Sequence, residues 1–192
     1  MTDSLLELFQ KEDALLSGHF QLSSGRHGDR YLQCALILQQ PKLAEELCRT
    51  LAGQFKNQKI GVVIAPALGG ILVSYEVARA LGVRSIFAER DNGLLTLRRQ
   101  FHIKEGERVL VVEDVVTTGK STQEVIDLVR GHKGRVVGVG ALVDRSGGET
   151  HFDVPLISLL QLDLTTYDPK TCPLCEKGIP AVKPGSRSAV RF

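Results

Sequence analysis

Short apolar runs alternate with helical patterns through the middle of the chain, and this alternation constrains the fold more than any other feature. The apolar runs cover residues 60–64, 85–88, 109–112 and 136–139, and helical patterns cover about 71–81 and 121–130. A strand that is apolar on both faces must be covered on both faces, so this order predicts parallel βαβ units. We therefore expect an α/β fold with a central, mainly parallel sheet flanked by helices.

Three segments lie outside this alternation. Residues 89–104 contain the hairpin-turn signal Asp91-Asn92-Gly93, which predicts a β-arm inserted between two strands of the sheet. Residues 1–40 combine an amphipathic helix with a Gly- and Ser-rich hairpin, and residues 168–192 predict an irregular tail rich in Pro, Gly, Lys and Cys. We expect one domain over residues 1–192 that carries these three segments.

Composition argues against several classes of function. The net charge is +2, from 24 basic and 22 acidic residues, which gives no electrostatic reason to expect nucleic acid or an anionic membrane as partner. No apolar run approaches the roughly 18–20 residues of a membrane-spanning helix, and the N-terminus does not resemble a signal peptide. The four cysteines are too few for a disulfide scaffold, so a reducing, cytoplasmic location is expected.

The densest chemical signal is an apolar strand that leads through two adjacent carboxylates and a short turn into a helix. The turn segment consists of Val115, Val116, Thr117, Thr118, Gly119, Lys120, Ser121 and Thr122. Its backbone N–H groups and hydroxyls can bind a phosphate dianion, and Gly119 permits close backbone approach. Glu113 and Asp114, just before the turn, suit ribose hydroxyls or a nearby cationic centre. Together these residues predict a sugar-phosphate site at the carboxyl end of a parallel strand.

The same segment also invites a P-loop or a purely structural interpretation. Gly119-Lys120-Ser121 resembles the end of a P-loop, but that motif needs glycine at the position of Asp114, so the P-loop interpretation fails. An ordinary strand, turn and helix cap accounts for each residue alone but not for the whole constellation.

This segment resembles the phosphoribosyl pyrophosphate motif of type I phosphoribosyltransferases. Further segments resemble the orotate-specific branch of that family, namely 20–27 with Tyr31, 66–71 and 142–145, and the tail from Cys172 to Arg187 resembles one bacterial group. The resemblance implies the type I phosphoribosyltransferase fold, with residues 1–40 as a hood over the base. It also implies that residues 89–104 form a mobile lid, donated to the neighbouring subunit of a homodimer.

The resemblance also implies residue roles and a reaction. The implied catalytic residues are Glu113, Asp114 and Arg90. The implied contacts to phosphoribosyl pyrophosphate come from these three, from residues 115–122 and from Ala67, Leu68 and Gly69. The implied contacts to orotate come from Thr117, Arg145 and Tyr31. The implied enzyme converts orotate to orotidine 5′-monophosphate in pyrimidine biosynthesis. It uses Mg²⁺ held mostly by substrate oxygens and water, so no protein ligand for the metal is assigned.

The chain departs from the family pattern at several charged positions. Well-known members carry Lys where this chain has Ser23 and Gly69. Their lids carry several Lys and a His, whereas the insert of this chain has Arg90, Arg98, Arg99 and His102. One alternative is therefore a phosphoribosyltransferase for another base, such as a purine. A second is a non-catalytic phosphoribosyl pyrophosphate sensor that regulates transcription, which the near-neutral charge disfavours.

Cysteine and histidine residues outside this motif give a weaker signal. Cys172-Pro173-Leu174-Cys175 has the spacing of a zinc knuckle, but a single pair favours a turn or structural packing over metal binding. A zinc ion shared across a dimer stays open as an alternative. His19 and His27 are interpreted as surface turn residues.

Overall fold

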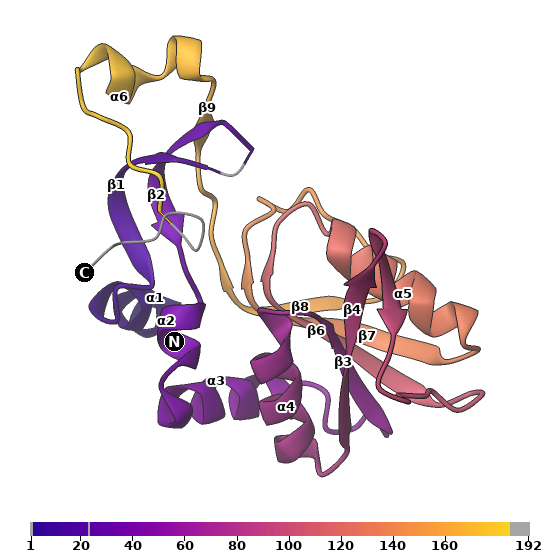
Figure 1. Ribbon diagram of the computed structural model, residues 1–192. Coiled ribbons are helices and arrows are strands. Elements are labelled where there is room, and N and C mark those ends of the chain that lie inside the picture. Colours follow the sequence, from indigo (N-terminus) through magenta and orange to yellow (C-terminus); the bar gives the residue numbers. More distant parts are fainter. Residues whose placement is uncertain (1, 23, 185–192) are drawn as a thin grey trace. The chain divides into compact units, whose positions relative to one another are not determined.

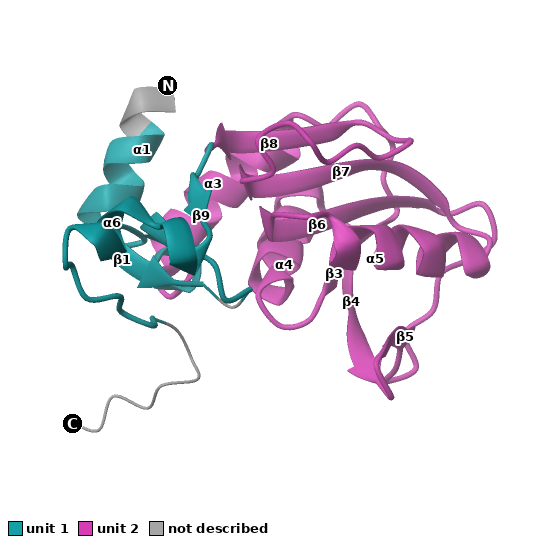
Figure 2. Cartoon of the chain, turned by 90° about the horizontal axis from the view of Figure 1, so that it is seen from above, with its two compact units in different colours: residues 1–37, 163–192 teal, residues 38–162 magenta. Residues whose placement is uncertain are grey.

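The computed structural model describes residues 2–22 and 24–184 of the chain (Figure 1). The chain forms two compact units, one of residues 1–37 and 163–192 and the other of residues 38–162 (Figure 2). The expected hood and the expected tail thus belong to one unit, which the sequence did not indicate. Ser23 and the end of the tail lie outside the described residues.

The larger unit contains a six-stranded sheet in the order β5-β4-β3-β6-β7-β8. Its strands are β3 (Val62–Pro66), β4 (Arg84–Asp91), β5 (Leu94–Leu97), β6 (Arg108–Val116), β7 (Arg135–Asp144) and β8 (Leu156–Gln161). Every neighbouring pair is parallel except β4 and β5. The prediction of a mainly parallel α/β sheet is confirmed, although β8 was not anticipated.

Helices cover both faces of this sheet, as its apolar strands require. The helices α3 (Pro41–Gly53) and α4 (Gly70–Leu81) pack on one face, and α5 (Lys120–Gly131) packs on the other (Figure 1). On the α5 side, Val62 and Ile64 join a buried apolar cluster with Val125 and Val129. On the opposite side, a Cβ at Gly140 would lie 3.2 Å from the Phe55 ring, so glycine at this position of β7 allows the ring to pack closely.

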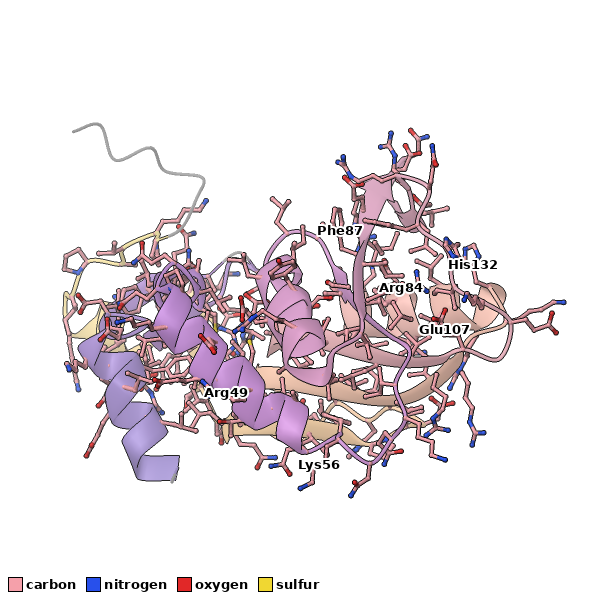
Figure 3. The ribbon with its side chains drawn as sticks, turned by 90° about the horizontal axis from the view of Figure 1, so that it is seen from below. Arg49, Lys56, Arg84, Phe87, Glu107 and His132 are labelled. Atoms are coloured by element: carbon pink, nitrogen blue, oxygen red, sulfur yellow. The ribbon has the colours of Figure 1, made fainter. Side chains whose placement is uncertain are left out.

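The predicted β-arm is an antiparallel hairpin formed by β4 and β5. Asp91 pairs with Leu94 across a two-residue loop, in which Asn92 and Gly93 have φ values of 49° and 85°. Positive φ at both loop residues is what a tight hairpin of this kind requires. Near the other end of β4, Arg84 and Glu107 point toward each other and form an ion pair at 2.9 Å (Figure 3).

The smaller unit contains a three-stranded antiparallel sheet in the order β1-β2-β9. Its elements are α1 (Thr2–Lys11), β1 (Leu15–Gln21), β2 (His27–Leu32), β9 (Thr166–Tyr167), the 3₁₀ turn η1 (Pro169–Thr171) and α6 (Pro173–Glu176), with α2 (Ala35–Leu38) at the boundary. The segment that we expected to be irregular therefore contains two helical turns. It also forms a bridge between Val182 and Phe20 of β1. Within the described residues, no helix has both the length and the apolar character to cross a membrane.

Candidate active site

The two adjacent carboxylates lie near the end of β6 in the larger unit. We expected the strand to end at Glu113 and Asp114, but β6 continues to Val116, so both side chains project from the strand itself. Glu113 is 7% exposed, and its Oε2 is buried with no hydrogen-bond partner among the described residues. Burial, and secondarily the charge of Asp114, raises the pKa of Glu113 to about 9. At neutral pH this carboxyl is protonated and can donate a hydrogen bond to a ligand oxygen, or ionise when a cation binds.

The loop between β3 and α4 lies directly against these carboxylates. A Cβ added to Gly69 would lie 2.6 Å from Oδ2 of Asp114. A Cβ added to Gly70 would lie 2.7 Å from Cβ of Ala65 and 3.4 Å from Oε1 of Glu113. The structure therefore brings together two sequence-predicted segments that are more than forty positions apart, and glycine is what allows the close approach.

The turn between β6 and α5 presents the start of a helix. Gly119, the residue before α5, has a φ of 71°, and a Cβ there would lie 2.5 Å from Cγ2 of Thr150 and 2.9 Å from the ring of Phe152. The Thr150 hydroxyl donates a 2.9 Å hydrogen bond to the Thr117 carbonyl, which holds the turn from behind. The first backbone N–H groups of a helix lack helical partners and, with the helix dipole, favour an anion. Oγ1 of Thr122, in the first turn of α5, is buried and has no hydrogen-bond partner in the described part of the chain.

Thr117 and Arg145 follow the ends of neighbouring strands. Val116 pairs with Asp144 in the register of β6 and β7, and the backbone N–H of Arg145 donates to the Val116 carbonyl at 2.8 Å. These two predicted base-binding residues are thus close together. Tyr31 belongs to the smaller unit, where its ring packs 5.7 Å from that of Phe20.

The arginines of the β-arm are engaged by carboxylates of the same chain. Nη1 of Arg90 lies 2.6 Å from Oε2 of Glu124 in α5 and donates to the Gly93 carbonyl at 2.7 Å. Arg99 donates two hydrogen bonds, of 2.8 and 2.9 Å, to Glu89, and these bonds lower the pKa of Glu89. Arg90 thus pairs with Glu124 of α5 and with the turn of its own hairpin through a single nitrogen, Nη1.

Comparison with known proteins identifies the family. The model of the "Phosphoribosyl transferase domain" matches residues 35–166. The chain belongs to the phosphoribosyltransferase family. It is 57% identical over 185 residues to an orotate phosphoribosyltransferase from Desulforamulus reducens, covering 96% of this chain and 97% of that protein. It is 60% identical over 185 residues to one from Pelotomaculum thermopropionicum, with the same coverage.

Solved structures agree with this assignment. The crystal structure of orotate phosphoribosyltransferase from Aeropyrum pernix superimposes with a TM-score of 0.70 at 28% identity, covering 82% of this chain and 93% of that one. An adenine phosphoribosyltransferase from Thermoanaerobacter pseudethanolicus matches with a TM-score of 0.62 at 20% identity, covering 69% and 88%, and shows the shared fold alone. The predicted type I phosphoribosyltransferase fold is confirmed.

Sequence reasoning missed several residues of this phosphoribosyltransferase site. Thr150 and Phe152 support the phosphate turn from a loop that carries no motif, and Glu124 was not recognised as the partner of Arg90. Thr150 and Phe152 act by packing closely beside Gly119, and this contact can be recognised only from the fold.

The interpretation of His19 and His27 as surface turn residues is wrong. They are 3% and 8% exposed, and they lie on β1 and β2 of the smaller unit. The Gly- and Ser-rich composition around them indicated a turn, whereas the turn itself falls between the two strands and does not include either histidine.

Proposed function

We propose that this phosphoribosyltransferase is an orotate phosphoribosyltransferase that works as a cytoplasmic, Mg²⁺-dependent homodimer. It converts orotate and phosphoribosyl pyrophosphate to orotidine 5′-monophosphate and pyrophosphate, a step of pyrimidine biosynthesis. The choice of base is supported by relatives of that name at 57% and 60% identity over almost the whole chain. The chemistry is supported by one observation above all: Glu113 and Asp114 meet the Gly69–Gly70 loop.

The 5-phosphate is assigned to the turn before α5. Gly119 gives the anion access to backbone N–H groups, and the buried hydroxyl of Thr122 is a donor that a phosphate oxygen can satisfy. Thr150 keeps the turn in place through its bond to the Thr117 carbonyl. This rigid anchor fixes one end of the sugar, and positioning of this kind accounts for a large part of catalysis in a substitution reaction.

The ribose hydroxyls are assigned to Glu113 and Asp114. Protonated Glu113 can donate to one hydroxyl oxygen, while Asp114 can accept from another, so the pair orients C1 of the sugar toward the base. Positive charge grows on the ribose ring in the transition state, and the nearby carboxylate of Asp114 stabilises that charge. Leu68 and Gly69 offer backbone N–H groups to the pyrophosphate, whereas the N–H of Ala67 donates to the Ala88 carbonyl at 2.8 Å, so Ala67 can contribute only by shaping the loop.

The same carboxyl groups fit the expected metal. Mg²⁺ prefers oxygen ligands and retains several waters, and the unpartnered Oε2 of Glu113 beside Asp114 supplies such oxygens. When bound, Mg²⁺ neutralises the charge that develops on the leaving pyrophosphate. Arg90 adds a second cation once it leaves Glu124.

The orotate ring is assigned to the ends of β6 and β7. A guanidinium forms two parallel hydrogen bonds with a carboxylate, which makes Arg145 suitable for the orotate carboxylate. Thr117 lies beside it through the bond between Arg145 and Val116. Tyr31 lies in the smaller unit, and its role toward the base stays a prediction from the family resemblance.

The homodimer is supported by apolar side chains that are exposed on the larger unit. Leu68, Leu72, Tyr75 and Leu94 are 83%, 50%, 61% and 71% exposed, and Tyr75 and Phe87 line an open hollow of about 350 Å³. Leu72 and Tyr75 lie on α4, Leu68 lies just before it and Leu94 lies on β5; exposed apolar side chains of this size are typical of an interaction surface. Light scattering on the purified protein should give twice the chain mass, and Tyr75→Glu should shift it toward the monomer.

The deciding experiment follows orotate by ultraviolet absorbance with phosphoribosyl pyrophosphate and Mg²⁺, and tests adenine, hypoxanthine, xanthine and uracil in parallel. The proposal is supported if the wild type consumes orotate and no other base, if Asp114→Asn loses this activity, and if the control Glu149→Gln retains it. Turnover of another base instead would keep the reaction class and refute the substrate. Binding of phosphoribosyl pyrophosphate without any turnover, together with salt-dependent DNA binding, would refute the enzyme in favour of a sensor.

A further inference from the structure

Two histidines and two cysteines of the smaller unit meet in one cluster. His19 comes from β1, His27 from β2, Cys172 precedes α6 and Cys175 lies within it. Their four potential ligand atoms, one from each side chain, all lie within 4.8 Å of one another. Because the cluster combines residues from both ends of the chain, no local motif could reveal it.

The distances within the cluster are close to those around a tetrahedral zinc ion. Nε2 of His19 lies 3.5 Å from Sγ of Cys172 and 3.8 Å from Sγ of Cys175, and Nδ1 of His27 lies 3.3 Å from Sγ of Cys175. Zinc bonds of about 2.3 Å to sulfur and about 2.0–2.1 Å to nitrogen place sulfur and nitrogen roughly 3.5 Å apart on a tetrahedron. The two histidine nitrogens are 2.8 Å apart, so zinc would require them to separate by about 0.5 Å.

The surroundings orient the side chains for metal binding. Nδ1 of His19 lies 2.6 Å from the Ile179 carbonyl, so this nitrogen carries the proton and the lone pair of Nε2 faces the cluster. An outer hydrogen bond of this kind is typical of histidines that bind metals. The Cys172 carbonyl accepts a hydrogen bond from the N–H of Glu176, and the Cys175 carbonyl accepts one from the N–H of Gly178. These bonds fold the segment that carries both cysteines into tight turns.

Burial separates this cluster from an ordinary surface group. His19, His27 and Cys172 are 3%, 8% and 1% exposed, whereas Cys175 is exposed and gives an ion access. Three buried polar side chains that face one another are stabilised when a cation satisfies all of them at once. A small structural unit with a limited core is also the setting in which proteins use metal sites for stability.

We propose that His19, His27, Cys172 and Cys175 bind one structural zinc ion within each chain. Two thiolates and two imidazoles in a tetrahedron favour zinc over Mg²⁺, and four protein ligands leave no open position for a substrate. The ion joins the N-terminal hairpin to the C-terminal segment. It is separate from the Mg²⁺ of the reaction, and the proposal does not depend on which base the enzyme uses.

Metal analysis of untagged protein tests the proposal directly. After desalting, mass spectrometry of the metals should find one zinc per chain in the wild type and in the control Cys48→Ala, which removes a buried thiol from α3. Cys175→Ser and His27→Gln should retain far less than one. Zinc absent from the wild type, half an ion per chain, or full occupancy in both cluster variants would each overturn the proposal.

Cobalt substitution provides a readout that needs no variant to fold. Chelator-treated wild type should take up one Co²⁺, with the intense visible bands of tetrahedral cobalt and sulfur-to-metal charge-transfer absorption, and zinc should displace it. A weak, octahedral spectrum, or none, would instead mean that the cluster is a hydrogen-bonded group without metal. Removal of zinc should also lower the melting temperature, since an ion that binds only the folded state stabilises it.

Discussion

Glu113→Gln should make the folded protein more stable, and increasingly so as the pH rises. In the folded protein, burial and the neighbouring Asp114 raise the pKa of Glu113 from 4.5 to about 9. In the unfolded chain the carboxyl returns to its ordinary pKa. Gln has nearly the same shape and carries no titratable proton, so it removes the cost of keeping this carboxyl neutral in the fold.

The sign and size follow from proton linkage. Between pH 4.5 and about 9 the folded state holds a proton on Glu113 that the unfolded state has lost, so the free energy of unfolding of the wild type falls as the pH rises. Each pH unit in this window costs at most about 1.4 kcal/mol. The advantage of Glu113→Gln over the wild type should therefore grow from at most about 2 kcal/mol at pH 6 to at most about 5 kcal/mol at pH 8.

Urea denaturation at pH 6, 7 and 8, without Mg²⁺ or substrate, measures this difference. Glu149→Gln makes the same chemical change on an exposed loop residue and should leave the difference from the wild type constant across this range. A Glu113→Gln advantage that stays constant or shrinks with pH would refute the reasoning, because Glu113 would then be ionised in the folded protein. The same variant keeps a donor for a ribose hydroxyl, so it should retain turnover if Glu113 acts as a protonated donor; a large loss would mean that Glu113 must ionise at the site.

Three further predictions concern the proposed reaction. Gly69→Ala should lower kcat/KM for phosphoribosyl pyrophosphate by about tenfold in a steady-state assay, because the new Cβ would displace Asp114. The control Gly53→Ala has open space around its Cβ and should have no effect in the same assay. Arg90→Ala should lower kcat more than Arg99→Ala does, which single-turnover and steady-state rates would show; equal losses would assign no special role to the first arginine. Chelation should abolish turnover within the assay time, and Mg²⁺ alone should restore it; recovery with zinc but not Mg²⁺ would contradict the assigned metal.

The sheet of the larger unit was predictable because its signals are local. The run around Val109–Val112 is apolar on both faces, and such a strand has few places to lie other than the centre of a covered sheet. The arm was predictable for the same reason, since Asn92 and Gly93 specify a tight hairpin within four residues. The residue types of the phosphate turn were also readable, because glycine and hydroxyl residues before a helix have a direct physical use.

Contacts between distant segments were not predictable. The approach of Gly69 to Asp114 depends on how β3 and β6 pair, and no local pattern specifies that register. The interpretation of the histidines was wrong for the same reason. His19 and His27 have no unusual neighbours along the chain, and their importance appears only when Cys172 and Cys175 arrive from the other end. A prediction from single motifs therefore could not show that the histidines and the cysteine pair lie together.

The shortage of positive charge at the site links substrate binding to the β-arm. Glycine at position 69 leaves Asp114 and Glu113 beside the proposed pyrophosphate loop, so the positive charge on that side of the site is expected to come from Mg²⁺ and from the arm. Arg90 of the arm is paired with Glu124 of α5. A partly exposed ion pair of this type is weak, about 0–1 kcal/mol where solvent reaches it, whereas an arginine that meets a phosphate can form stronger, charge-assisted hydrogen bonds. Phosphoribosyl pyrophosphate with Mg²⁺ should therefore draw Arg90 from Glu124 at little cost, and if the arm is the lid that the family resemblance implies, its closure would depend on the substrate.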